Sequence, residues 1–146
     1  MRRYVIWAPW LVLAATIVVG CGGGGGGGTP PPTDQFVLTG TVLDDKTSSP
    51  VVGAVVEVAT NTTSTDSQGR FRFELSVAPT VETYSIDGTA ASPAPGYYVF
   101  WAKADGKEQN ATCIELPTVM PKTGTDLGTV YLRNTDNPPP FPPLCP

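Results

Sequence analysis

The sequence predicts an all-β protein, an antiparallel sandwich of six or seven short strands, and three observations support this. Charged residues make up only 15% of the 146 positions, while Gly and Pro each occur 16 times, a composition that favours short strands and turns over helices. Apolar and polar residues alternate in several short runs, which is the period of a half-buried strand. No run combines helix-capping signals with an apolar stripe of helical period.

The predicted strands follow one another with turn signals between them. RFRFEL (Arg70–Leu75) alternates most clearly, with Phe71, Phe73 and Leu75 on one face. The polar segment 61–69 (NTTSTDSQG) precedes it and is interpreted as a connection. In chain order the predicted strands are residues 36–44, 51–60, 70–75, 81–87, 97–105, 111–116 and 126–132. The residues expected to face inward are Leu38, Val42, Ala54, Val56, Val58, Phe71, Phe73, Leu75, Tyr98, Phe100, Val130 and Leu132.

Residues 1–20 differ from the rest of the chain and have the layout of a secretory signal peptide. Arg2 and Arg3 precede an apolar run, which ends in the small residue Gly20 before Cys21. The run is short for a membrane-spanning helix and contains Pro9, which argues against the alternative of an uncleaved anchor.

The sequence VVGC, residues 18–21, resembles the lipobox of bacterial lipoproteins. The resemblance implies that Cys21 is lipidated with fatty acids such as palmitate and becomes the first mature residue. Gly22 follows it, not Asp, which implies the outer membrane or cell surface if the source has two membranes. Loss of the leader's two arginines leaves 7 basic and 13 acidic residues, a net charge of −6.

Residues 21–35 predict a tether between this anchor and the strands. Seven consecutive glycines, 22–28, bury no apolar surface and are expected to stay flexible, spanning roughly 15 Å. A phosphate-binding loop would need GxxxxGK[ST], or GxGxxG between a strand and a helix, and neither is present.

Four segments in order resemble the carboxypeptidase regulatory-like domain: LTGTVLDDKTSSPVVGAVVEV, TDSQGRFRFEL, YYVFWAKADG and DLGTVYL. The resemblance implies a seven-stranded, transthyretin-like Greek-key sandwich over residues 36–133. The last nine residues contain six prolines, which cannot donate to a strand ladder, so residues 134–146 are expected to form an extended tail. Segment 78–95 is longer than the family's usual connection. The family is named after enzymes in which this domain accompanies a zinc carboxypeptidase unit. That unit is missing here, so the resemblance implies no activity.

Composition excludes several function classes. The chain has no histidine, which excludes Ser-His-Asp and Cys-His catalysis and zinc sites with imidazole ligands. The net charge of −4 argues against nucleic acid as a partner. Asp44, Asp45 and Asp66 could offer carboxylates to calcium, but without the EF-hand spacing they are better interpreted as turn residues. We therefore expect no enzyme activity, no cofactor and no metal.

Strand 97–105 carries the one ligand hypothesis with residues attached. If its last alanine faces inward, alternation turns Tyr98 and Phe100 inward and places Tyr97 and Trp101 outward, two pleats apart. Such an aromatic strip could stack against a sugar. The alternative is that segment 78–95 or the proline tail covers the strip, because exposed apolar patches are usually covered or are interfaces.

Cys113 and Cys145 remain once Cys21 is lipidated. Exported proteins occupy oxidising compartments, so a bridge that staples the tail to the sandwich is predicted. The alternatives are a core-packed Cys113 with Cys145 paired to another molecule, or no pairing.

Two functions are consistent with these features. The first is a non-enzymatic, lipid-anchored cell-envelope protein that displays its sandwich for structural or adhesive contacts with envelope proteins. The alternative is a surface lipoprotein that binds polysaccharide through Tyr97 and Trp101. Both have the membrane as a partner through the lipid.

Overall fold

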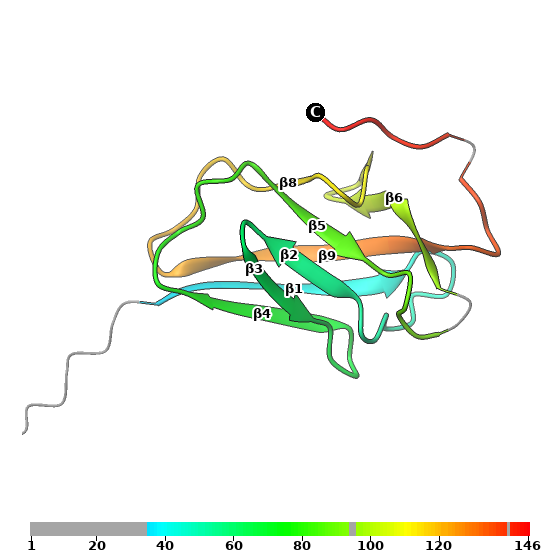
Figure 1. The fold of residues 1–146 in the computed structure, drawn as a ribbon, viewed down its shortest axis with the longest axis horizontal. Helices are drawn as coiled ribbons and strands as arrows, with labels where there is room; N and C mark the ends of the chain where they lie inside the picture. Colours follow the sequence, from blue (N-terminus) through cyan, green and yellow to red (C-terminus); the bar gives the residue numbers. More distant parts are fainter. Residues whose placement is uncertain (1–34, 94–95, 140) are drawn as a thin grey trace, which may run out of the picture. The chain divides into compact units, whose positions relative to one another are not determined.

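The computed structural model describes residues 35–93, 96–139 and 141–146, which fold into two packed β-sheets (Figure 1). The predicted all-β sandwich is confirmed. The predicted signal peptide, the lipidation site Cys21 and the tether up to residue 34 lie outside the described residues. Within the described ranges, no helix is long and apolar enough to cross a membrane.

One sheet has five strands and the other has four. The first has the order β4-β1-β9-β6-β7, with β1 (Phe36–Asp44), β4 (Arg70–Leu75), β6 (Tyr97–Ala104), β7 (Lys107–Gln109) and β9 (Gly124–Asn134). The second has the order β3-β2-β5-β8, with β2 (Val55–Val58), β3 (Asn61–Ser64), β5 (Thr83–Asp87) and β8 (Ile114–Glu115).

Two strands in this set were not predicted from the sequence. β3 lies in the polar segment interpreted as a connection, and it pairs only with β2 at the edge of its sheet. Its residues are largely exposed, so no apolar alternation marks it. β7 has three residues at the edge of the other sheet. The described chain therefore has nine strands where seven were expected.

The pairing is also not antiparallel throughout, because β1 and β9 run parallel. β9 enters the sheet beside the start of β1, where Gly124 lies opposite Val37. Gly124 has a φ of 120°, and a β-carbon there would collide with the carbonyl oxygen of Val37. Only glycine fits this entry point.

The core lies between the two sheets and contains every residue expected to face inward except Tyr98 and Phe100. β1 and β4 alternate strictly between buried and less buried positions, as predicted. The ring of Phe71 packs against Gly40, where a β-carbon would lie 2.5 Å from the ring. The close approach of β4 to β1 thus depends on a glycine at this position.

Candidate functional site

The predicted aromatic strip on β6 is not exposed. Tyr97 and Trp101 are each only 1% exposed, whereas Tyr98 and Phe100 are half-buried and stack on each other with ring centroids 5.0 Å apart. The prediction that Tyr97 and Trp101 form a surface for glycan contact is wrong. Neither ring has a face free for a sugar in this conformation.

An irregularity in β6 explains the error. Tyr97 lies opposite Asn134 and Ala102 lies opposite Leu132, so five steps along β6 match two steps along β9. Tyr97 and Ala102 both belong to the core although they are five positions apart, an odd number. Strict alternation cannot place both on one face, and a bulge can.

Trp101 is also buried but lies outside the core cluster to which Ala102 belongs. The guanidinium carbon of Arg133 lies 4.2 Å from the centroid of its ring. Arg133 also pairs with Asp45 at 3.2 Å. Trp101 is therefore buried and makes a cation–π contact, so its ring is not available as the predicted outward-facing surface. Sequence analysis missed Arg133, which carries no local signal because its partners lie far away in the sequence.

Tyr97 points into the core and donates its hydroxyl to Oδ2 of Asp44 at 3.0 Å. The other oxygen, Oδ1, accepts from the amides of Lys46 and Thr47 at 2.9 and 2.8 Å. Burial by itself would raise the pKa of Asp44, but the hydrogen bonds, led by those from Thr47, outweigh it and hold the pKa below the ordinary 3.8. Burial, followed by the Asp44 contact, raises the pKa of Tyr97.

Tyr97→Phe is expected to lower the free energy of unfolding at neutral pH by about 1.5–3 kcal/mol, because it leaves a buried carboxylate oxygen without its donor. The lowered pKa of Asp44 favours the charged carboxylate in the folded state. Its stabilisation is therefore present above the unfolded pKa of 3.8 and is lost as the pH falls through the lower folded value. Urea unfolding of both proteins across this acidic range should show the difference shrinking.

Tyr98→Phe is the matched control for this prediction. Its hydroxyl donates to the carbonyl of Thr135 at 3.2 Å in an exposed setting. Tyr98→Phe is expected to change the free energy of unfolding only slightly, and by the same amount at every pH. An equal effect of the two substitutions would contradict the role assigned to the Asp44–Tyr97 hydrogen bond.

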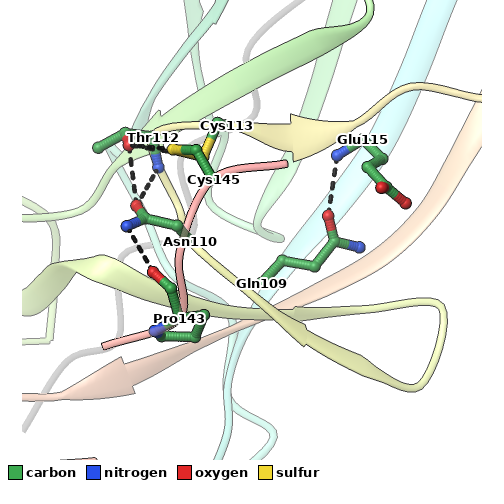
Figure 2. The surroundings of a disulfide bond; sticks show 7 residues. All are labelled: Gln109, Asn110, Thr112, Cys113, Glu115, Pro143 and Cys145. Carbon is green, nitrogen blue, oxygen red and sulfur yellow. Dashed lines mark hydrogen bonds between the residues drawn. A yellow bond between two sulfur atoms is a disulfide. The ribbon is translucent and has the colours of Figure 1, made fainter. Parts of the chain in front are cut away.

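The tail after β9 turns back and is joined to the body by the predicted disulfide, Cys113–Cys145 (Figure 2). The two Cα atoms are 5.7 Å apart. Asn110 donates its side-chain amide to the carbonyl of Pro143 at 2.9 Å, and its Oδ1 accepts from the amide and hydroxyl of Thr112. The segment between β7 and β8 is therefore the docking point of the tail.

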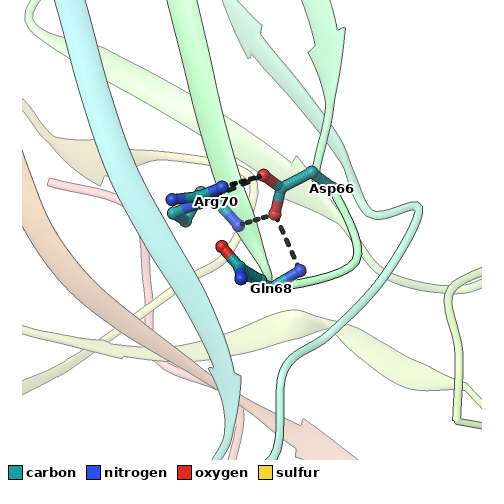
Figure 3. Close-up of polar contacts among 3 residues, drawn as sticks. All are labelled: Asp66, Gln68 and Arg70. Atoms are coloured by element: carbon teal, nitrogen blue, oxygen red, sulfur yellow. Dashed lines mark hydrogen bonds and ion pairs between the residues drawn. The ribbon is translucent and has the colours of Figure 1, made fainter.

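Asp66 acts as a turn residue, as the sequence predicted (Figure 3). Its Oδ1 accepts from the amides of Gln68 and Arg70 at 2.8 and 2.9 Å, and Oδ2 pairs with the guanidinium of Arg70 at 3.0 Å. These donors lower the pKa of Asp66, the backbone amide of Arg70 most strongly. The described residues contain no cluster of three ligating side chains that could hold a metal ion.

A shallow groove of about 510 Å³ lies beside this turn, on β1, β3, β4 and β9. Its polar lining includes Thr39, Thr41, Asp66, Arg70 and Arg72. The two arginines already have acidic partners, Asp66 and Glu74. Their ion pairs are exposed, so the two arginines offer a polar contact surface and no uncompensated positive charge.

Comparisons with known proteins do not assign the chain to a family. No family model matches it, and no curated protein matches it. It is similar at 18% identity to part of the crystal structure of a 9R-lipoxygenase from Cyanothece PCC8801, with a TM-score of 0.36. The match covers 69% of this chain and 17% of the lipoxygenase chain. A similarity of this extent assigns neither family nor activity, so the carboxypeptidase regulatory-like resemblance stays a prediction.

Proposed function

We propose that this chain is a lipid-anchored cell-envelope protein that displays a non-enzymatic β-sandwich, of the carboxypeptidase regulatory-like kind, for structural or adhesive contacts with other proteins. The observation that carries the proposal is the Cys113–Cys145 disulfide. Structural disulfides persist in oxidising compartments outside the cytosol. An exported location is also what the predicted signal peptide and the VVGC sequence at its end indicate.

The roles of the ionisable side chains support a scaffold. Asp44 and Asp66 hold turns through backbone amides. Arg133 contacts both Asp45 and Trp101. These groups stabilise local structure, and both carboxylates accept hydrogen bonds within the protein, whereas Nε of Arg133 is buried without a partner among the described residues. A stable module with a polar surface suits display more than chemistry.

The anchor is tested with Cys21→Ala in a bacterial host fed an alkyne-tagged palmitate analogue. The wild-type protein is expected to incorporate the label and to enter the detergent phase of Triton X-114, because Cys21 is the thiol that receives lipid. Cys21→Ala is expected to lose the label completely. The label is the deciding measurement, since an uncleaved apolar leader could by itself hold the variant in detergent.

Cys145→Ser is the matched control for this experiment. It removes a cysteine and breaks the disulfide but leaves the anchor intact, so it is expected to incorporate the label as the wild type does. Equal labelling of the wild type and Cys21→Ala would sink the proposal of lipid anchoring.

A further inference from the structure

A second, smaller hollow of about 140 Å³ lies where the two sheets meet at the ends of several strands. Its lining comes from both sheets: Tyr84 of β5 and Glu115 of β8 from one, and Ala104, Asp105 and residues 126–128 from the other, with Pro117 on the connection after β8. The volume corresponds to roughly four or five water molecules. It is large enough for the head of a small ligand.

Tyr84 is the polar group at the buried side of this hollow. The residue is 3% exposed, and none of the hydrogen bonds among the described residues involves its hydroxyl, which is not fully shielded from solvent. Burial, together with the nearby negative charge of Asp105, raises the pKa of Tyr84 well above its ordinary value. The phenol therefore stays neutral and keeps lone pairs with which it can accept a hydrogen bond.

Three carboxylates surround the same hollow, from Asp105, Glu115 and Asp126. None of them forms an ion pair with a lysine or arginine in the described part of the chain. Asp126 uses Oδ1 to accept from the amide of Gly128 at 3.0 Å, which leaves its second oxygen available. The hollow thus combines unneutralised negative charge with a tyrosine hydroxyl that reaches solvent and has no partner among the described residues.

The lining also limits the kind of cation that would fit. These carboxylates do not come together as a metal-ligating cluster in the described residues. Ala104, Pro117 and Leu127 give the hollow an apolar wall beside them. An organic cation with its own N–H donors and an aliphatic stem matches this combination better than a bare ion.

We propose that this hollow binds a primary ammonium group carried on a short aliphatic chain. The ammonium would donate to the hydroxyl of Tyr84 and to a neighbouring carboxylate, the other carboxylates would contribute their negative charge, and the methylene groups would lie against Pro117 and Leu127. A lysine side chain of a partner protein has this form, as does a free alkylamine. The proposal does not depend on lipid anchoring, so either can fail without the other.

The test is a chemical-shift titration of the full chain in detergent micelles, following the amides of Leu127 and Gly128. The probe is 5-aminopentan-1-ol, and the control probe is pentane-1,5-diol, which replaces the ammonium with a hydroxyl. Saturable binding of the amine on the order of millimolar is expected, with no saturation by the diol. Acetyl-glycyl-lysyl-glycinamide forms the second arm: its binding assigns lysine side chains to the site, and binding of the free amine alone assigns small amines.

Isosteric variants locate the binding. Asp105→Asn together with Glu115→Gln is expected to raise the Kd of the amine roughly tenfold or more, and Tyr84→Phe at least threefold, because each removes a charge-assisted hydrogen bond. Glu57→Gln, at an exposed position of β2, should leave the Kd unchanged. The Asp105 and Glu115 side chains are at exposed positions, so that variant tests the site even if Tyr84→Phe disturbs the core.

The proposal is overturned by any of three results. The first is the absence of saturable amine binding up to about 100 mM. The second is equal binding of the amine and the diol. The third is an unchanged Kd in the folded Asp105→Asn, Glu115→Gln variant.

Discussion

Phe73→Ala is expected to lower the free energy of unfolding by about 3–5 kcal/mol, the range for a buried phenylalanine truncated to alanine. Phe73 is 4% exposed and lies opposite Leu38 on β1. Its ring makes an edge-to-face contact with Phe71, with centroids 6.2 Å apart. A domain of this size is stable by only about 5–15 kcal/mol. The expected loss is therefore a large share of the total free energy of unfolding, and urea unfolding can measure it.

Arg72→Ala is the control, since it changes the neighbouring residue on the opposite face of the same strand. Its ion pair with Glu74 is exposed, and such pairs contribute about 0–1 kcal/mol. If Arg72→Ala proved the more costly substitution, the facing of β4 would be wrong by one residue, because a one-residue shift exchanges the two faces of a strand.

The strands β1 and β4 were predictable to the residue because their alternation is uninterrupted. Every second side chain enters the core, and that pattern is written into the sequence itself. β3 has no such pattern, because its residues are largely exposed. It is a strand because its backbone pairs with β2. The edge strand β7 is too short for any periodicity.

β6 was predictable as a strand but not in its facing. Its first five residues are all apolar or aromatic, so either face could have been the buried one. The bulge against β9 and the hydrogen bond of Tyr97 to Asp44 determine which side chains of β6 are buried. These two residues are 53 positions apart, and no local pattern reports a contact across that distance.

The hollow around Tyr84 could not be predicted either, because its lining residues are far apart in the sequence. Its three carboxylates follow or lie on different strands, and each one alone resembles an ordinary exposed acidic residue. The parallel entry of β9 beside β1 places Asp126 near the ends of β6 and β8. A site assembled by sheet topology in this way leaves no spaced motif in the sequence.

From the sequence the disulfide was one of several alternatives. Pairing requires Cα atoms within roughly 7 Å, and a sequence does not show that distance. The fold supplies that proximity by returning the tail to the segment between β7 and β8. The bridge closes a loop over a sequence separation of 32 residues, and that loop contains β9. It therefore constrains the strand that pairs with both β1 and β6.

Cys145→Ser is accordingly expected to lower the free energy of unfolding by about 2–4 kcal/mol. The chain-entropy model gives a loop of this length roughly 3–4 kcal/mol, and the ordering of the tail in the folded state offsets part of it. Urea unfolding at neutral pH measures the change.

Dithiothreitol should lower the free energy of unfolding of the wild type by the same amount. It should leave that of Cys145→Ser unchanged, since the variant has no bridge to reduce. Cys21→Ala, which keeps the bridge, should respond to the reductant like the wild type. If mass spectrometry of unreduced envelope material found both Cys113 and Cys145 alkylated, the bridge and this prediction would be refuted together.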